Sequence, residues 1–364
     1  MVKYIDEYRD IRKVRYFAEK IKELNPGRKI NLMEVCGGHT ITILKYGLRE
    51  LLPENVNLIS GPGCPVCVTS VDFIDAAIEL SKKDGIVIAT FGDLVRVPGT
   101  ESSLFYEMAK GADVKICYSP GDALRLALRE RSKEIVFLGI GFETTAPSVG
   151  VTILNAYENS VDNFSVLSSH KVMPPAMKFL LESGEVDING FICPGHVSTI
   201  TGVSIYEFIA RDYKVPCVVS GFEPADLMES IYMLVWQISE GRAEVENQYK
   251  RVVRYSGNEK AQKVMSEVFE PVDVRWRGIA LIPESGLGIK EKYKQLDAFW
   301  KFGIRLRSGR ENPACICGEV LKGVKTPFDC KLFGKVCTPE NPVGACMVST
   351  EGACAIYYKY GDRV

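Results

Sequence analysis

The sequence predicts an α/β protein that has two parallel-sheet domains and a Cys-rich C-terminal iron-sulfur domain. Short apolar runs alternate with amphipathic stretches from about residue 30 to residue 219, which is typical of βαβ units. Beyond that region the alternation ends, and six of the twelve cysteines fall within residues 315–354. A chain of 364 residues also fits two or three domains, at roughly 100 to 200 residues each.

The expected strands are the apolar runs of the alternating region. In chain order they are Ile30–Val35, Asn57–Ser60, Ile86–Thr90, Val114–Tyr118, Ile135–Ile140, Phe164–Ser168, Asn189–Cys193 and Cys217–Ser220. The carboxyl ends of parallel strands meet at one edge of a sheet, where ligands bind. The loops that follow these strands are therefore the first places to look for a functional site.

Helix start and stop signals separate the strands. Ser119-Pro120-Gly121-Asp122 combines a cap, a first-turn proline and an acidic third residue. Met173-Pro174-Pro175 predicts a second helix that ends near Gly184, and Pro224 predicts a third that ends at Gly241.

These patterns divide the chain into four expected segments. They are an N-terminal helical segment that packs on the rest (1–29), a first α/β domain (30–138), a second α/β domain (139–241), and a helical and Cys-rich iron-sulfur domain (242–364). From Pro313 onward, Gly, Pro and Cys dominate. Such a segment cannot build a large core, so a cofactor or packing against the rest must hold it.

Composition excludes several functions. The 45 basic and 46 acidic residues leave a net charge of −1, so no global field attracts nucleic acid or an anionic membrane. No signal peptide is recognisable, and the longest apolar runs are far shorter than the roughly 20 residues that span a bilayer. Phosphate-loop and dinucleotide-binding motifs are absent. We expect a cytoplasmic protein that binds neither nucleic acid nor membrane.

The loop after the first expected strand, CGGHT, places a thiol and an imidazole on either side of two glycines. A helix that begins there would favour the thiolate form of Cys36 through its N-terminus. We expect Cys36, His39 and Thr40 to be functional. The alternative is a buried cysteine beside a capping histidine and threonine.

The loop after the second expected strand, GPGCPVC, enters a helix that is expected to run to about Lys83. Cys64 and Cys67 at a helix start suit thiol-disulfide exchange, because the N-terminal amides stabilise a leaving thiolate. Alternatively the pair supplies half of a zinc site that Cys36 and His39 would complete. We favour redox or iron handling.

Two further loops add polar groups after apolar strands. GFETTAP carries Glu143 and Thr144, and CPGHVS carries His196. These side chains could serve a ligand at the edge of the sheet or could merely cap helices.

The six C-terminal cysteines follow the spacing C-x-C, twelve residues, C-x6-C-x8-C-x7-C. Soft thiolates in this number suit zinc or an iron-sulfur cluster. Zinc ribbons usually use paired CxxC motifs, whereas the only close pair here is Cys315 and Cys317, which favours a cluster. A 4Fe-4S cluster needs four ligands, so two cysteines would remain for a neighbouring disulfide.

Together, CGGHT, GPGCPVC, GFETTAP, PGHVS and the tail CICGEVLKG…FGKVCTPENPVGACMVSTEGACAIYYKY resemble HypD, the iron-sulfur maturation proteins of nickel-iron hydrogenases. The resemblance covers nearly the whole chain. It implies a redox-active assembly scaffold rather than a conventional turnover enzyme. In stable complex with HypC, such a scaffold holds a transient iron while two cyanides, delivered by HypE, and one carbon monoxide are attached. The Fe(CN)2CO unit then passes through HypC to the hydrogenase large subunit.

The resemblance also implies roles for particular residues. Cys36 would be the iron ligand shared with a HypC cysteine, with His39 and Thr40 beside it, and Cys64 and Cys67 would be the redox-active pair. By position, Glu143, Thr144 and His196 would protonate or orient cyanide.

The tail further resembles the cluster site of ferredoxin-thioredoxin reductase. That resemblance implies Cys315, Cys330, Cys337 and Cys354 as ligands of a 4Fe-4S cluster and Cys317 and Cys346 as the adjacent disulfide. Two other functions stay open, a general thiol-disulfide oxidoreductase and a structural zinc-binding interaction protein.

Overall fold

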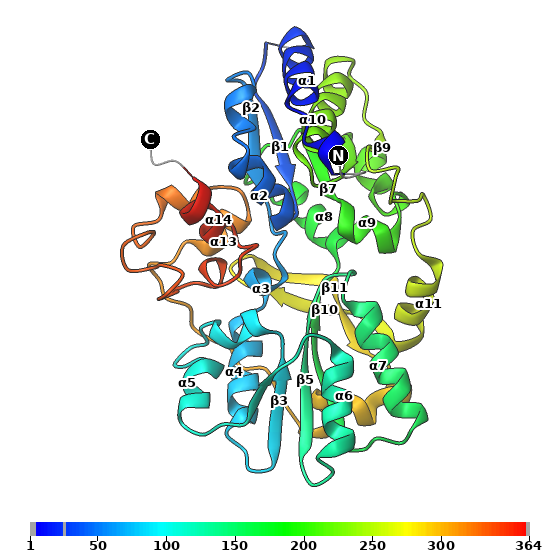
Figure 1. Ribbon diagram of the computed structural model, residues 1–364, viewed down its shortest axis with the longest axis vertical. Helices are drawn as coiled ribbons and strands as arrows, with labels where there is room; N and C mark the ends of the chain where they lie inside the picture. Colours follow the sequence, from blue (N-terminus) through cyan, green and yellow to red (C-terminus); the bar gives the residue numbers. More distant parts are fainter. Residues whose placement is uncertain (1–4, 25–26, 362–364) are drawn as a thin grey trace.

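The computed structural model describes residues 5–24 and 27–361 of the chain. Two parallel sheets lie at opposite ends of the long axis, and an antiparallel hairpin lies between them (Figure 1). The Cys-rich C-terminal part packs on one side of the molecule, beside helices α2 (Gly37–Lys45) and α3 (Pro65–Val68). In the described ranges, no helix is both long enough and apolar enough to cross a membrane.

Both large sheets are entirely parallel. The first sheet has the order β2-β1-β7-β8-β9, with β1 at Ile30–Glu34, β2 at Val56–Ser60, β7 at Gly190–Pro194, β8 at Cys217–Ser220 and β9 at Val245–Asn247. The second sheet has the order β4-β3-β5-β6, with β3 at Ile86–Thr90, β4 at Val114–Ile116, β5 at Glu134–Gly141 and β6 at Phe164–His170. The hairpin consists of β10 (Phe269–Trp276) and β11 (Ala280–Ile289).

Helices surround each sheet (Figure 1). Near the first sheet lie α1 (Ile11–Leu24), α2, α8 (Met173–Ser183), α9 (Gly195–Thr201) and α10 (Pro224–Ser239). Near the second sheet lie α4 (Val71–Ser81), α5 (Leu104–Ala109), α6 (Pro120–Arg129) and α7 (Ala146–Glu158), and α11 (Glu259–Val268) packs on α7. The remaining helices are short and are α3, α12 (Ala298–Lys301), α13 (Cys317–Leu321) and α14 (Ala353–Tyr360).

The structure confirms the α/β class and all eight strands expected from the sequence. It also confirms the helix signals. The Ser119 hydroxyl accepts the N–H of Asp122 and completes a capping box on α6, α10 begins at Pro224, and α8 ends at Gly184 in the left-handed conformation. These features are local, which is why residue spacing alone predicts them.

The strands expected within residues 30–138 do not share one sheet. The strands β1 and β2 belong to the first sheet, whereas β3, β4 and β5 belong to the second. The chain returns to the first sheet at β7, which pairs with β1 through Leu32 opposite Gly190. The sheets therefore do not follow the contiguous ranges 30–138 and 139–241, because strand pairing is a tertiary contact that spacing does not determine.

The hairpin and one helix break were not expected. Instead of one helix to Lys83, α3 and α4 are separated at Thr69, where the backbone is extended and pairs with Trp276 at the end of β10. The fully buried Trp276 also stacks on Phe142, with ring centroids 5.9 Å apart. The hairpin thus ties the second sheet to the chain between the two helices.

Candidate metal and thiol site

The first two loops expected to be functional pack backbone against backbone at the carboxyl ends of β1 and β2. The Gly61 N–H donates to the Glu34 carbonyl over 2.7 Å, and the Gly37 N–H donates to the Gly63 carbonyl over 3.4 Å. A Cβ atom on Gly63 would lie only 2.2 Å from the Cys36 backbone nitrogen. Only a glycine fits there, so the turn that carries Cys36 and the turn that carries Cys64 are held together.

Gly63→Ala should therefore destabilise the fold. The methyl group must push two backbone segments apart, and overpacking of this kind costs about 1–3 kcal/mol of unfolding free energy. Urea unfolding measures the change. Gly92→Ala is the matched control, because its Cβ would meet only an ordinary contact at 3.7 Å. Equal stability of the two variants would contradict the packing argument.

Cys36 is buried, with 8% of its surface exposed. Burial raises the pKa of its thiol to about 12, and the nearby carboxylates of Glu351 and Glu34 act in the same direction. The expectation that the helix N-terminus favours the thiolate is therefore wrong for the metal-free site, because desolvation outweighs the N–H groups of Gly38 and His39. A bound metal cation would supply the positive charge that stabilises the thiolate form of Cys36.

The carboxylate of Glu34 lies beneath the Cys36 turn. It accepts the Cys36 N–H over 3.0 Å and the hydroxyl proton of Thr40. Burial raises the pKa of Glu34 to about 7. Thr40 therefore positions the turn through Glu34, a residue that the sequence analysis overlooked even though it ends the first expected strand.

Two of the three histidines meet at one aromatic ring. His39 and His196 both stack on Phe222, with ring centroids 4.8 Å and 3.9 Å away. His39 is fully buried, and within the described ranges neither of its ring nitrogens makes a hydrogen bond. Burial lowers the pKa of His39 to about 4 and also lowers the pKa of His196. Both imidazoles are neutral at neutral pH and are available as ligands or acceptors.

Glu143 makes its contacts elsewhere. Its Oε1 accepts the N–H of Met173 over 2.9 Å at the start of α8, while Oε2 has no partner among the described residues. Burial raises the pKa of Glu143 to about 7, and the neighbouring Thr144 is exposed. These contacts match the alternative considered from the sequence, a carboxylate that caps a helix.

Glu143→Gln should remove a loss of stability that appears as the pH rises. The folded protein holds the Glu143 proton up to a pKa of about 7, whereas an unfolded carboxyl releases it near 4.5, so rising pH destabilises the fold between these values. The cost reaches about 3 kcal/mol above the folded pKa. Urea unfolding at pH 4 should give equal stabilities, and at pH 8 the variant should be more stable, because glutamine still accepts the Met173 N–H. An unchanged difference between the two pH values would contradict this account.

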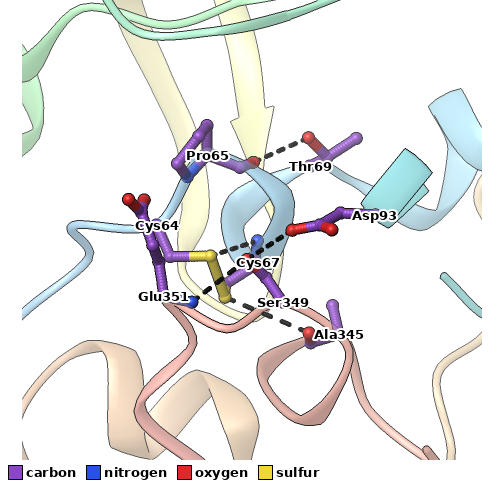
Figure 2. Close-up of a disulfide and its surroundings, with 8 residues drawn as sticks. All are labelled: Cys64, Pro65, Cys67, Thr69, Asp93, Ala345, Ser349 and Glu351. Atoms are coloured by element: carbon purple, nitrogen blue, oxygen red, sulfur yellow. Dashed lines mark hydrogen bonds between the residues drawn. A yellow bond between two sulfur atoms is a disulfide. The ribbon is translucent and has the colours of Figure 1, made fainter. Parts of the chain in front are cut away.

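Cys64 and Cys67 form a disulfide at the start of α3 (Figure 2). The Cys64 sulfur accepts the Cys67 N–H over 3.2 Å. The Cys67 sulfur lies 4.0 Å from the carbonyl oxygen of Ala345, the residue before Cys346. The disulfide therefore contacts the Cys-rich part directly.

Residues 345–351 connect all three thiol sites. Beside the disulfide, the Ser349 hydroxyl donates to Asp93 over 2.9 Å, and Ser349 accepts the Glu351 N–H over 3.3 Å (Figure 2). The same segment packs closely against the Cys36 turn. A Cβ on Gly37 would lie 2.3 Å from the carbonyl oxygen of Glu351. The three sites thus share one connecting segment.

Three thiols form the tightest group in the Cys-rich part. The sulfurs of Cys317, Cys346 and Cys354 lie within 4.8 Å of one another, and all three residues are buried. Hydrogen bonds from the first two thiols lower the pKa of Cys354 to about 6. Cys315 adjoins this group, because a Cβ on Gly344 would lie 2.5 Å from its sulfur and 2.6 Å from that of Cys317. Buried, converging thiols fit a metal-thiolate centre.

The structure groups these cysteines differently from the expected partition. Cys317 and Cys346, expected as a disulfide, are both free thiols and belong to the tightest group. Of the four expected ligands, only Cys354 belongs to that group. Spacing could not reveal this, because the long loops between the cysteines allow many arrangements.

Sequence reasoning also missed charged residues that only the tertiary structure buries. Lys171 is 1% exposed, its amino group donates to the Ser169 hydroxyl over 3.1 Å, and burial lowers its pKa to about 7. Arg277 is 3% exposed at the turn of the hairpin. No local motif surrounds either residue, so the sequence offered no signal for them.

Known proteins that resemble this chain do so along nearly its whole length. The family model HypD, described as "Hydrogenase formation hypA family", matches residues 12–361. "Hydrogenase maturation factor HypD" of Cupriavidus necator is 48% identical over 99% of this chain and 97% of its own length. A "Putative hydrogenase expression/formation protein" of Methanocaldococcus jannaschii is 49% identical over 96% of each chain, and "Hydrogenase maturation factor HypD" of Escherichia coli is 43% identical over 100% and 99%.

Proposed function

Because the chain belongs to the HypD family of hydrogenase formation proteins, we propose that it is the scaffold on which an Fe(CN)2CO unit is assembled. In this proposal a stable complex with HypC holds the iron, HypE delivers cyanide transiently, and the finished unit passes through HypC to the large subunit of a nickel-iron hydrogenase. One observation carries the proposal. The Cys36 turn, the Cys64–Cys67 disulfide and the Cys-rich group all contact residues 345–351.

Cys36 is the proposed iron ligand on this chain. Low-spin iron with cyanide and carbon monoxide suits soft thiolate donors, and the buried thiol would lose its proton when the metal binds. A HypC cysteine would complete the pair of thiolates. Glu34 and Thr40 hold the turn beneath Cys36 in place.

His39 and His196 are the proposed groups for orienting cyanide. Their support is the shared stack on Phe222 and the lowered pKa values, which keep both imidazoles neutral at neutral pH, so that each could hydrogen-bond cyanide without carrying a charge. Glu143 and Thr144 belong to the proposal through their place after β5. Because Oε1 of Glu143 accepts the N–H of Met173, a role in orienting or protonating cyanide would fall to Oε2, which has no partner among the described residues.

Cys64 and Cys67 are the proposed source of electrons. The disulfide takes up two electrons and two protons to give two thiols, and its re-formation releases them during assembly. A 4Fe-4S cluster held by cysteines of the C-terminal part would supply one-electron transfer. The resemblance assigns Cys315, Cys330, Cys337 and Cys354 as its ligands, while Cys317 and Cys346 compete for that role through their closeness to Cys354.

Anaerobic co-expression with HypC tests the proposal. We expect the purified complex to contain about four cluster irons, inorganic sulfide and one additional iron. Infrared bands of bound cyanide and carbon monoxide should accompany that additional iron. Zinc without sulfide would indicate the structural zinc-binding protein instead. Turnover on insulin disulfides without cyanide or carbon monoxide bands would indicate a general thiol-disulfide oxidoreductase.

A further inference from the structure

The half-buried phenylalanine that follows β8 is wedged between two of the motif loops. A Cβ on Gly38 would lie 3.0 Å from the Cδ1 atom of Phe222, and a Cβ on Gly195 would lie 3.1 Å from its Cε2 atom. Gly38 belongs to CGGHT at the start of α2, and Gly195 belongs to PGHVS at the start of α9. In both motifs the glycine directly precedes the histidine. The two glycines therefore leave the space that the ring of Phe222 fills.

The two histidines lie on opposite faces of that ring. The planes of His39 and His196 are tilted by only 28° and 22° from the plane of Phe222, and their centroids are 4.8 Å and 3.9 Å from its centroid. Two nearly parallel imidazoles so close to one centroid would overlap if they shared a face. His39 is fully buried, whereas His196 is exposed. Phe222 therefore stands between a buried imidazole and an exposed one.

Packing, and not hydrogen bonding, orients the imidazole of His39. A histidine at a functional site is usually oriented by a hydrogen bond at the ring nitrogen that does not act on the ligand. Within the described ranges, neither ring nitrogen of His39 makes such a bond. Its backbone N–H donates to the Cys36 carbonyl over 2.9 Å, which fixes the main chain but not the direction of the ring. The stack on Phe222 supplies that direction.

The loop that carries Phe222 is itself held from two sides. On one side, the hydroxyl of Thr42 in α2 donates to the Phe222 carbonyl over 2.7 Å. On the other side, the Glu223 N–H donates to Asp226 over 3.2 Å. The fully buried Asp226 also accepts two hydrogen bonds from the guanidinium of Arg251, over 2.8 Å and 2.6 Å. The ring of Phe222 thus has a fixed anchor on each side of the two histidines.

We infer that Phe222 is a positioning residue of the proposed assembly site and sets the direction of both imidazoles. The inference rests on the proposed function, since it requires that His39 and His196 orient the cyanide on iron. The same glycine links the ring to the proposed iron ligand, because a Cβ on Gly38 would lie 3.7 Å from the Cys36 sulfur. Phe222 has no group that binds iron or transfers a proton, so it acts only through the two histidines.

Nuclear magnetic resonance of protein labelled with carbon-13 in its histidines tests the positioning without any metal. The chain has three histidines, and His170 on β6 of the second sheet serves as the internal reference. A proton above the face of an aromatic ring resonates at high field. In Phe222→Leu the ring signals of His39 and His196 should therefore move to lower field, while that of His170 stays in place. Unchanged signals of His39 and His196 in this variant would overturn the inference.

The infrared bands of the complex with HypC test the consequence for assembly. In Phe222→Leu the cyanide and carbon monoxide bands should fall about tenfold, a loss typical of residues that orient a ligand without touching it. Phe222→Tyr keeps the aromatic ring and should restore most of the intensity. Phe17→Leu is the matched control, because Phe17 is also half-buried but lies in α1, and it should change neither the bands nor the histidine signals. Bands of full intensity in Phe222→Leu would overturn the inference.

Thr42→Val gives a second test that keeps the ring of Phe222. Loss of the hydroxyl frees the Phe222 carbonyl, so the signals of His39 and His196 should move and the bands should weaken. Should Phe222→Leu fail to fold, unchanged signals and bands in Thr42→Val would overturn the inference. Absence of the bands from the wild-type complex would instead count against the proposed function.

Discussion

Replacing Cys36 by alanine is expected to abolish the cyanide and carbon monoxide bands of the complex co-expressed with HypC. The iron that carries these ligands would lose its only proposed protein ligand on this chain, and neither neutral histidine supplies the charge of a thiolate. Infrared spectroscopy and iron quantitation of the purified complex measure the loss. The fold should remain, since alanine keeps the small buried side chain of a position that is 8% exposed.

The outcome must be separated from a general effect of losing a cysteine. Cys117→Ala is the control, because Cys117 is also a buried free thiol but follows β4 in the second sheet. It should keep the bands at wild-type intensity. Bands that persist in Cys36→Ala would remove this residue from the proposed iron site. Cluster iron and sulfide should be unchanged in both variants. That result would show that the two metal sites form independently.

The triple variant Cys317→Ser, Cys346→Ser and Cys354→Ser is expected to lose the metal centre of the C-terminal part completely. These residues hold the three closest sulfurs, and removing three of the six cysteines there leaves three, one fewer than a 4Fe-4S cluster requires. Visible absorption, iron and sulfide should all fall to background. The segment should also become easier to cleave by protease, because it has little core of its own.

Single variants then decide the ligand set. Under the partition implied by the resemblance, Cys330→Ser loses the cluster absorbance, whereas Cys317→Ser and Cys346→Ser keep it. Because Cys317 and Cys346 lie so close to Cys354, we instead expect at least Cys346→Ser to lose the cluster absorbance. Retention of a full cluster in the triple variant would rule out both assignments.

Local features of the fold could be predicted from the sequence. The β-branched run at Ile86–Thr90 was expected with its observed bounds, and the capping box at Ser119 follows from residues that are neighbours in the chain. The hairpin was missed because β10 and β11 bury little apolar surface, so their sequences lack a clear strand pattern. Hydrogen bonding between the two strands, a tertiary contact, holds them in place. Residues that depend on such pairing, such as Trp276, carried no local signal.

In the candidate site, too, the sequence shows the motifs, whereas only the tertiary structure shows the contacts between them. The motifs around Cys36 and Cys64 were visible because glycine, cysteine and histidine are unusual together after strands. Their contacts with one another and with Glu351 depend on parallel pairing of β1 with β2 and on a segment near the other end of the chain. The stack of His39 and His196 depends on Phe222, which belongs to a loop with no polar group of its own apart from its neighbour Glu223.

By itself, the sequence determined the α/β class, the eight strands of the two parallel sheets, the capped start of α6 and the types of donor available, because backbone propensity, caps and side-chain chemistry are local properties. Only the tertiary structure decided which donors meet, which of them are desolvated and which charges lie beside them. The physical reason is that pKa values and metal affinity depend on burial and on neighbours across the fold. Cys36 illustrates both, since its thiol was evident from the sequence while its raised pKa comes from burial beside Glu351 and Glu34.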